Sequence, residues 1–235
     1  MLVSAAVCPH PPLMVPELAA GAATELDALR AACDNAVQRM VGSGPDLVVA
    51  VGPDVGGSGV REFPADAYGS FAAYGVDIGV GSPYPGQQPL PLSLAVGAWL
   101  LRRCAWDGQQ LFVALGTDVD PDTCLGMGKQ LAQRADRVAV LVLGDGSARR
   151  SEKAPGFVDA RAVPYDSEIR RALELGDLRA LAELDPEVSA ELLVGGRTAW
   201  QVLAGAAEGL DVNATLLAQE SPYGVAYFVA SWVVS

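Results

Sequence analysis

The feature that most constrains the fold is a series of short apolar segments that alternate with longer helical patterns. Each has five or six mostly apolar residues bounded by Gly, Pro or Asp, at 2–7, 47–51, 76–80, 111–115 and 138–143. Apolar runs of this length without polar alternation are typical of strands that helices cover on both faces. We therefore expect one α/β domain over residues 1–235, with a central, mostly parallel or mixed sheet flanked by helices.

Helix signals fill the intervals between these segments. Apolar residues recur at helical spacing over 24–40, and Thr24 with Asp27 resembles a capping box. Asp120-Pro121 and Asp185-Pro186 each offer an N-cap residue followed by proline at the first helical position. These signals predict helices at 24–40, 121–134, 165–175 and 186–207, long loops at 52–75 and 81–91, and a final, antiparallel strand at 225–234.

The charge balance narrows the range of partners. The chain has 16 Lys and Arg against 28 Asp and Glu, which gives a net charge of −12. Such an excess of negative charge repels phosphate backbones and anionic lipid, so we expect neither a nucleic-acid nor a membrane partner. The four cysteines are widely spaced without a CxxC pair, and residues 1–7 are typical of a first strand rather than a signal peptide. We expect reduced, mostly buried thiols and a cytoplasmic protein.

Polar residues follow four of the predicted strands. His10, the single histidine of the chain, lies just after the first strand, and Asp54, Asp118 and Asp145 follow the second, fourth and fifth. If these strands are parallel, the four side chains meet at one edge of the sheet, where α/β proteins place their ligands. An imidazole with carboxylates can bind a divalent ion. Each aspartate taken alone is more typical of a turn or a helix cap.

Several other site types are excluded. A Ser-His-Asp triad would have to use His10, and the chain has no Gly-x-Ser-x-Gly turn for its nucleophile. Phosphate-binding and dinucleotide-binding glycine motifs are absent from the sequence, and so are the Cys and His spacings of zinc sites. Gly126 and Gly128 lie inside a helical pattern and indicate no such loop.

Four segments in order resemble a known family. They are Cys-Pro-His-Pro-Pro-Leu-Met-Val-Pro-Glu at 8–17, the stretch 46–54, Leu-Gly-Asp-Gly-Ser-Ala-Arg at 143–149, and a tail with Gly-Gly-Arg at 195–197 and Tyr-Gly-Val-Ala-Tyr-Phe at 223–228. Together they are similar to the class III extradiol ring-cleavage dioxygenases of the LigB-like type and to their Memo-like relatives. The resemblance covers nearly the whole chain and implies a LigB-like fold.

The resemblance also implies an Fe(II) site of two histidines and one carboxylate, with a further histidine as general acid or base. His10 matches the first histidine ligand of the family. Asp54 stands at the position of the second histidine, Val194 at that of the carboxylate, and Ala148 at that of the acid–base histidine. Because valine and alanine have no lone pair to donate, the family's iron site cannot form here in its usual way.

Glu191 offers a partial replacement for the missing carboxylate. It lies three residues before Val194, a spacing that places both on one helical face. A metal site would then consist of His10, Asp54 and Glu191, a ligand set that holds Fe(II) less tightly and favours Mn or Mg more than the family's set does. We expect the pocket around it to be lined by Asp118, Asp145, Ala148 and Val194.

We therefore expect a LigB-like dioxygenase homologue with a degenerate non-haem iron site, a pseudoenzyme that cleaves no ring and binds a small molecule or a partner. One alternative is an active metal-dependent enzyme, a dioxygenase or another, that uses the altered ligand set. The other is a structural component of an oligomer. The first interpretation assigns no catalytic residue and no cofactor, whereas the second requires Fe(II) or another divalent metal. The expected ligand is a small molecule, and the family resemblance implies an aromatic one. A homodimer is a further option for the oligomeric state.

Overall fold

Seven strands form the central sheet, in the order β3-β6-β2-β7-β1-β9-β8. The computed structural model describes residues 1–81 and 88–235, so part of the loop expected at 81–91 lies outside the described residues. The strands of this sheet are β1 (Leu2–Cys8), β2 (Leu47–Asp54), β3 (Val60–Phe63), β6 (Gln109–Gly116), β7 (Val138–Leu143), β8 (Val212–Glu220) and β9 (Tyr227–Val234).

The four inner strands that the sequence predicts are parallel. β7 pairs in parallel with both β1 and β2, and β2 pairs in parallel with β6. β9 pairs antiparallel with β1 and β3 with β6, so the sheet is mixed toward its edges. The expected α/β architecture and the antiparallel last strand are therefore confirmed.

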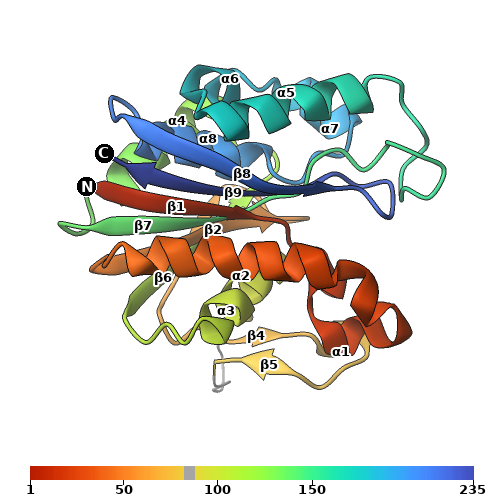
Figure 1. The fold of residues 1–235 in the computed structure, drawn as a ribbon, viewed down its shortest axis with the longest axis horizontal. Helices are drawn as coiled ribbons and strands as arrows, with labels where there is room; N and C mark the ends of the chain where they lie inside the picture. The colour runs from red at the N-terminus through yellow and green to blue at the C-terminus, as the bar shows by residue number, and fades with distance from the viewer. Residues whose placement is uncertain (82–87) are drawn as a thin grey trace.

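Helices cover both faces of this sheet (Figure 1). One face carries α1 (Pro16–Ala19), α2 (Asp27–Gly42) and α3 (Leu92–Arg103), and the other carries α4 (Pro121–Leu131), α5 (Ala162–Leu175), α6 (Leu178–Ala182), α7 (Pro186–Glu191) and α8 (Arg197–Ala206). Short 3-10 helices lie at Pro12–Met14, Ala20–Leu26 and Ala72–Tyr74. The three-layer arrangement gives each apolar strand two covered faces.

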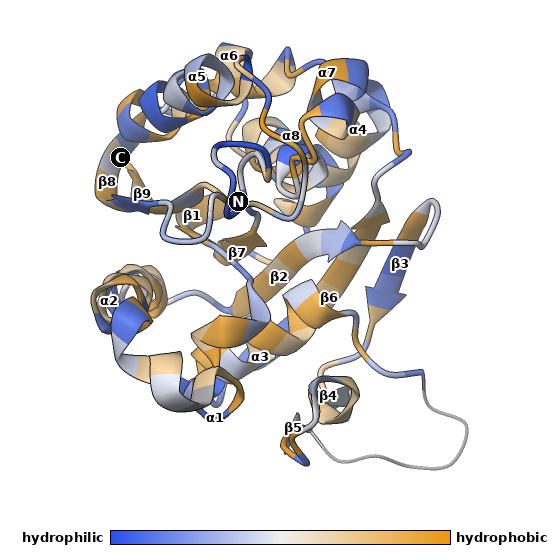
Figure 2. Ribbon diagram, turned by 90° about the vertical axis from the view of Figure 1, so that its right-hand side faces the viewer, coloured by the Kyte–Doolittle hydropathy of each residue, from blue (hydrophilic) through white to orange (hydrophobic). Residues whose placement is uncertain are grey.

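The core is divided by the sheet into two apolar clusters. Val49 and Val51 of β2 belong to one cluster, whereas Val48 and Ala50 belong to the other. This division follows from the geometry of a strand, in which successive side chains point to opposite faces. Figure 2 shows the apolar colouring of β2 and β6 against the hydrophilic edge strand β3.

Several sequence predictions differ from the structure. The segment 76–80 is not a strand of the main sheet; Gly79–Val80 forms β5, which pairs only with β4 (Gly69–Ser70). The helix expected at 186–207 is two helices, because the chain turns at Leu193, whose φ is 55°, and at the following glycine pair. Thr24 does not cap the long helix, which begins after Leu26 without a side-chain cap.

Helices α4 and α8 pack at very close range through two glycines. A Cβ atom on Gly128 of α4 would overlap the main-chain carbonyl oxygen of Val202, and one on Gly205 of α8 would overlap that of Leu125. Gly126, two residues earlier on α4, has no atom within 4 Å of its Cβ position. The glycines at 128 and 205 are therefore required by backbone contact, and the one at 126 is not.

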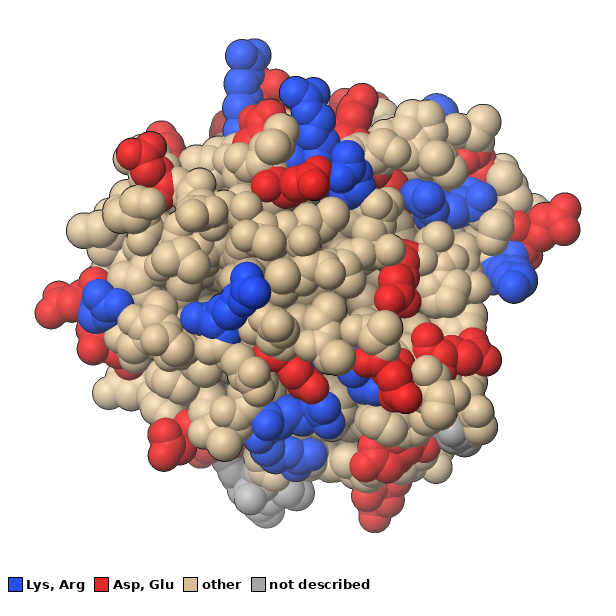
Figure 3. All heavy atoms as spheres, viewed as in Figure 1, with Lys and Arg blue, Asp and Glu red and all other residues tan. Residues whose placement is uncertain are grey.

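Charged side chains do not gather into one patch on the face seen in Figure 3, where Lys and Arg lie among Asp and Glu. The four thiols are free, with Cys8, Cys33 and Cys124 buried and Cys104 half-buried. Within the described parts of the chain, we find no helix with the length and apolar character needed to cross a membrane.

Candidate functional site

The predicted polar residues lie along the carboxyl edge of the parallel strands. His10 comes after β1, Asp145 after β7, Asp54 at the end of β2 and Asp118 after β6. Because neighbouring strands are about 4.8 Å apart, the strand carrying His10 and the strand carrying Asp54 are separated by roughly 10 Å, with β7 between them. Strand order therefore makes Asp145 the aspartate next to His10.

His10 and Asp145 form a largely buried pair. His10 is only 7% exposed, and its main-chain N–H donates a 2.9 Å hydrogen bond to Asp145 Oδ1. The ring Nδ1 lies 3.5 Å from the same oxygen and has no hydrogen-bond partner among the described residues. Burial raises the pKa of the Asp145 carboxyl group, and the His10 charge and N–H oppose that rise. The pair therefore has a polar ring atom that the protein leaves unsatisfied.

Gly195 lies against this pair. A Cβ atom added to it would be 3.5 Å from His10 Cε1 and 3.6 Å from Asp145 Cβ, both ordinary van der Waals distances. Gly195 belongs to the turn between α7 and α8. This contact brings the C-terminal third of the chain to the edge that carries His10.

Asp54 has a different partner. It is 8% exposed, and its carboxylate accepts a hydrogen bond from the guanidinium of Arg61, on the edge strand β3. Gly57 lies so close that a Cβ there would overlap the Asp54 carboxylate. This charge-assisted hydrogen bond satisfies one oxygen of the Asp54 carboxylate and competes with a metal ion for it.

Asp166 of α5 holds the loop that carries Asp145 in place through hydrogen bonds. This fully buried carboxylate accepts hydrogen bonds from Ser147 N at 2.8 Å, Ser147 Oγ at 2.6 Å and Arg150 at 2.7 Å. Three donors, one of them charged, satisfy its oxygens, as a buried carboxylate requires. Asp166 therefore positions the loop after β7, a role that the sequence does not reveal.

The other predicted site residues are dispersed. Glu191 is exposed at the end of α7, where its carboxylate forms a 2.6 Å ion pair with Arg161. Asp118 is exposed, and half-buried Ala148 makes main-chain hydrogen bonds to Leu192 and Gly156. Val194 is 8% exposed and belongs to an apolar core cluster as well as to a cavity wall.

These positions do not fit the iron site that the family resemblance implies. Among residues 1–81 and 88–235, no group of three or more His, Cys, Asp or Glu side chains is placed to hold a metal ion. The expected set of His10, Asp54 and Glu191 is therefore not gathered here, because Arg61 binds one carboxylate and Arg161 holds the other at the surface. Ala148 and Val194 offer no ligand atom.

A cavity of about 310 Å³ opens beside Gly195. Val55, directly after β2, and Thr117, directly after β6, form one wall, so the cavity lies at the carboxyl edge of the sheet. The other wall comes from α7, the turn after it and the first turn of α8, including Leu193, Val194 and Arg197. This size is at the lower end of the range for small-molecule sites.

Arg197 is the charged residue in the described lining of this cavity, and it is not among the site residues predicted from the sequence. It is 3% exposed, and its guanidinium donates to the Gln201 side chain at 2.9 Å and to the Thr117 carbonyl at 2.6 Å. The signal in the sequence is Gly-Gly-Arg at the start of a helix, which carries the family resemblance but does not by itself indicate a binding residue.

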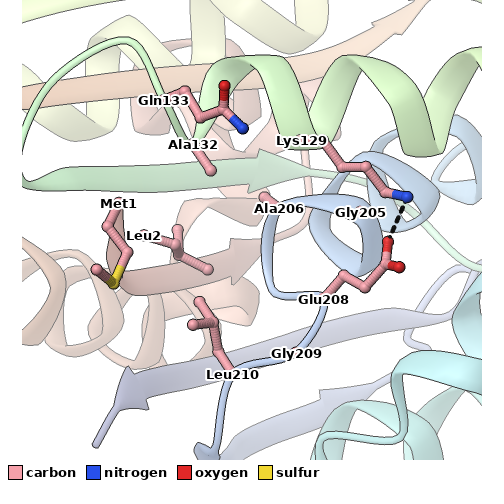
Figure 4. Close-up of a pocket in the computed structure, with 10 residues that line it drawn as sticks. All are labelled: Met1, Leu2, Lys129, Ala132, Gln133, Gly205, Ala206, Glu208, Gly209 and Leu210. Carbon is pink, nitrogen blue, oxygen red and sulfur yellow. Dashed lines mark ion pairs between the residues drawn. The ribbon is translucent and has the colours of Figure 1, made fainter.

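A second cavity, of about 590 Å³, lies at the opposite, amino-terminal end of the strands (Figure 4). Its wall includes Met1, Leu2 and the ends of α4 and α8. The charges at its rim, Lys129 and Glu208, form a 2.6 Å ion pair with each other. Because these charges neutralise one another, we place the candidate site at the carboxyl edge.

The fold and this edge define a single-domain α/β protein with a mixed seven-stranded sheet and a small cleft. A solved structure with this architecture is that of the uncharacterized protein JW3007 from Escherichia coli K12. It is 14% identical, with a TM-score of 0.52, and the match covers 98% of this chain and 99% of that one. No family model and no curated protein matches the sequence. At this identity the likeness establishes the fold alone.

Proposed function

We propose that this chain is a LigB-like extradiol dioxygenase homologue that has lost the iron site, and that it binds a small organic molecule at the carboxyl edge of its sheet without cleaving a ring. The observation that carries the proposal is the set of residues around His10. The one family ligand that the chain retains lies beside Asp145, without the second histidine, the carboxylate or the acid–base histidine around it.

The cavity beside Gly195 supports the binding half of the proposal. It has apolar walls, a few polar groups and a position at the carboxyl ends of parallel strands, which is where α/β proteins bind ligands. The loss of catalytic groups removes ring cleavage but leaves this concave surface in place. Both points support a pocket that binds without turnover.

The test combines metal analysis, turnover and binding. Protein purified anaerobically with Fe(II) is expected to retain well under one equivalent of iron and to form no ring-opened product from catechols in air. Fluorinated aromatic probes followed by ¹⁹F NMR are expected to bind saturably to the wild type. Ala190→Trp, on the cavity wall, should abolish that binding, and Ala31→Trp, exposed on α2, should not.

Two results would overturn the proposal. A ring-opened product that accumulates in proportion to the protein would favour the metal-dependent enzyme instead. Probe binding that is absent, or that survives Ala190→Trp unchanged, would remove the binding site from this edge.

A further inference from the structure

Arg197 is a buried positive charge without a counter-charge. Both of its hydrogen bonds go to neutral acceptors, the Gln201 amide and the Thr117 carbonyl, and they use two of its five N–H donors. Among the ion pairs of the described residues, none includes Arg197. A buried charge is costly unless a counter-charge is supplied, so this guanidinium favours an anion in the adjoining cavity.

The amino terminus of α8 adds to this preference. Its N-cap residue is Gly196, which has no side chain to accept from the first-turn N–H groups, and no side-chain cap is present. Gly195 and Thr198, on either side of this turn, line the same cavity as Arg197. Free N–H groups and the helix dipole at the start of a ten-residue helix attract anions.

The lining of the cavity contains no acidic residue in the described part of the chain. The acidic excess of the chain, 28 acidic against 16 basic residues, is therefore not carried into this lining. Asp145 is the carboxylate behind Gly195, and its Oδ1 already accepts the His10 N–H. The unsatisfied Nδ1 of buried His10 belongs to the ring that a Cβ atom on Gly195 would contact. The electrostatic environment of the cavity is therefore set by Arg197.

We propose that the ligand of this cavity is a small organic monocarboxylate, with its carboxylate on Arg197 and the first turn of α8. Its apolar body would lie along Val55, Leu193 and Val194, and the volume of about 310 Å³ suits a molecule of benzoate size. Guanidinium groups bind carboxylates through two parallel hydrogen bonds. This inference rests on the proposed function and specifies the class of ligand.

The experiment compares 4-fluorobenzoate with its neutral counterpart 4-fluorobenzyl alcohol, by ¹⁹F NMR titration at pH 7. Wild-type protein is expected to bind the benzoate at least roughly tenfold more tightly, the size of effect that one charge-assisted hydrogen bond supplies. Arg197→Gln should remove that preference. Arg170→Gln makes the same charge change at an exposed i,i+4 pair with Glu174 and should leave the preference intact.

The wild-type comparison needs no variant, so the inference is tested even if Arg197→Gln fails to fold. Equal binding of the acid and the alcohol, blocked by Ala190→Trp, would overturn the carboxylate inference and leave the proposed function standing. If neither probe binds, the carboxylate inference and the proposed function are both overturned. An equal loss of preference in both arginine variants would assign the effect to net charge and overturn the role of Arg197.

Discussion

The main-chain N–H of His10 donates a hydrogen bond to the carboxylate of Asp145, which joins the loops after β1 and β7 across 135 residues of sequence. The two strands are parallel neighbours, so their ends come together whenever the sheet forms. The hydrogen bond fixes the backbone of the one histidine in the chain. Among the residues predicted at this edge, His10 therefore pairs with Asp145 on the adjacent strand, and not with the more distant Asp54.

We predict that Asp145→Asn folds and that Asp145→Ala is less stable, by about 1–3 kcal/mol at pH 7, because alanine leaves the His10 N–H without an acceptor. The pKa of Asp145 is raised in the folded state. The protonated Asp145 carboxyl group therefore stabilises the fold fully at pH values below its pKa in the unfolded chain. This stabilisation is lost as pH rises through its pKa in the folded protein. The free energy of unfolding of the wild type relative to Asp145→Asn should fall as pH rises above about 4, the pKa of an unfolded aspartate, in urea titrations. Parallel pH profiles would contradict this.

Asp166 should be among the most sensitive positions in the chain. We predict that Asp166→Ala lowers the free energy of unfolding by about 3–5 kcal/mol, because it leaves Arg150 and two Ser147 donors without their buried acceptor. Glu168→Ala, exposed on the same helix, is the control and should change stability by less than about 0.5 kcal/mol. Similar losses in the two variants would show that Asp166 does not hold the loop.

The α4–α8 contact predicts opposite effects for glycines two residues apart. Gly128→Ala and Gly205→Ala should each destabilise the protein by about 1–3 kcal/mol or more, because the new methyl group meets backbone of the other helix. Gly126→Ala meets nothing and should gain roughly 0.5–1 kcal/mol from helix propensity. The midpoints of thermal unfolding of the three variants, compared with that of the wild type, measure these stability changes. A stable Gly205→Ala would mean that the helices are further apart in solution.

The thiols should be slow to alkylate in the native protein. Burial raises the pKa of Cys104 and of Cys124 to about 11 each, and burial and a hydrogen bond with Cys8 raise that of Cys33. Since only the thiolate reacts, half-buried Cys104 should react with iodoacetamide at pH 8 roughly 100-fold more slowly than a free cysteine. Mass spectrometry should find it modified first, with all four cysteines reacting in urea. Rapid modification of Cys124 would indicate local opening.

The sequence predicted the elements that are buried and periodic. Strands β1, β2, β6 and β7 lie where apolar runs indicated them, since a strand covered on both faces is apolar throughout. It missed β8, whose residues alternate between half-buried and exposed at the edge of the sheet. It also missed α3, in which eight of twelve residues are buried, because a segment that is apolar nearly all round has no helical stripe to detect.

For the site, the sequence alone determined that His10 and three aspartates follow predicted strands. It placed them at one edge only on the condition that these strands are parallel, and the structure supplies that pairing. Only the tertiary structure decided which of them meet, because the order β2-β7-β1 differs from the order along the chain. It likewise placed Glu191 beside Arg161 and Arg197 against the Thr117 carbonyl, contacts between residues 30 and 80 positions apart. Local patterns specify strands and helices through short-range periodicity, whereas partners in a site are set by packing between distant segments, which no local pattern records.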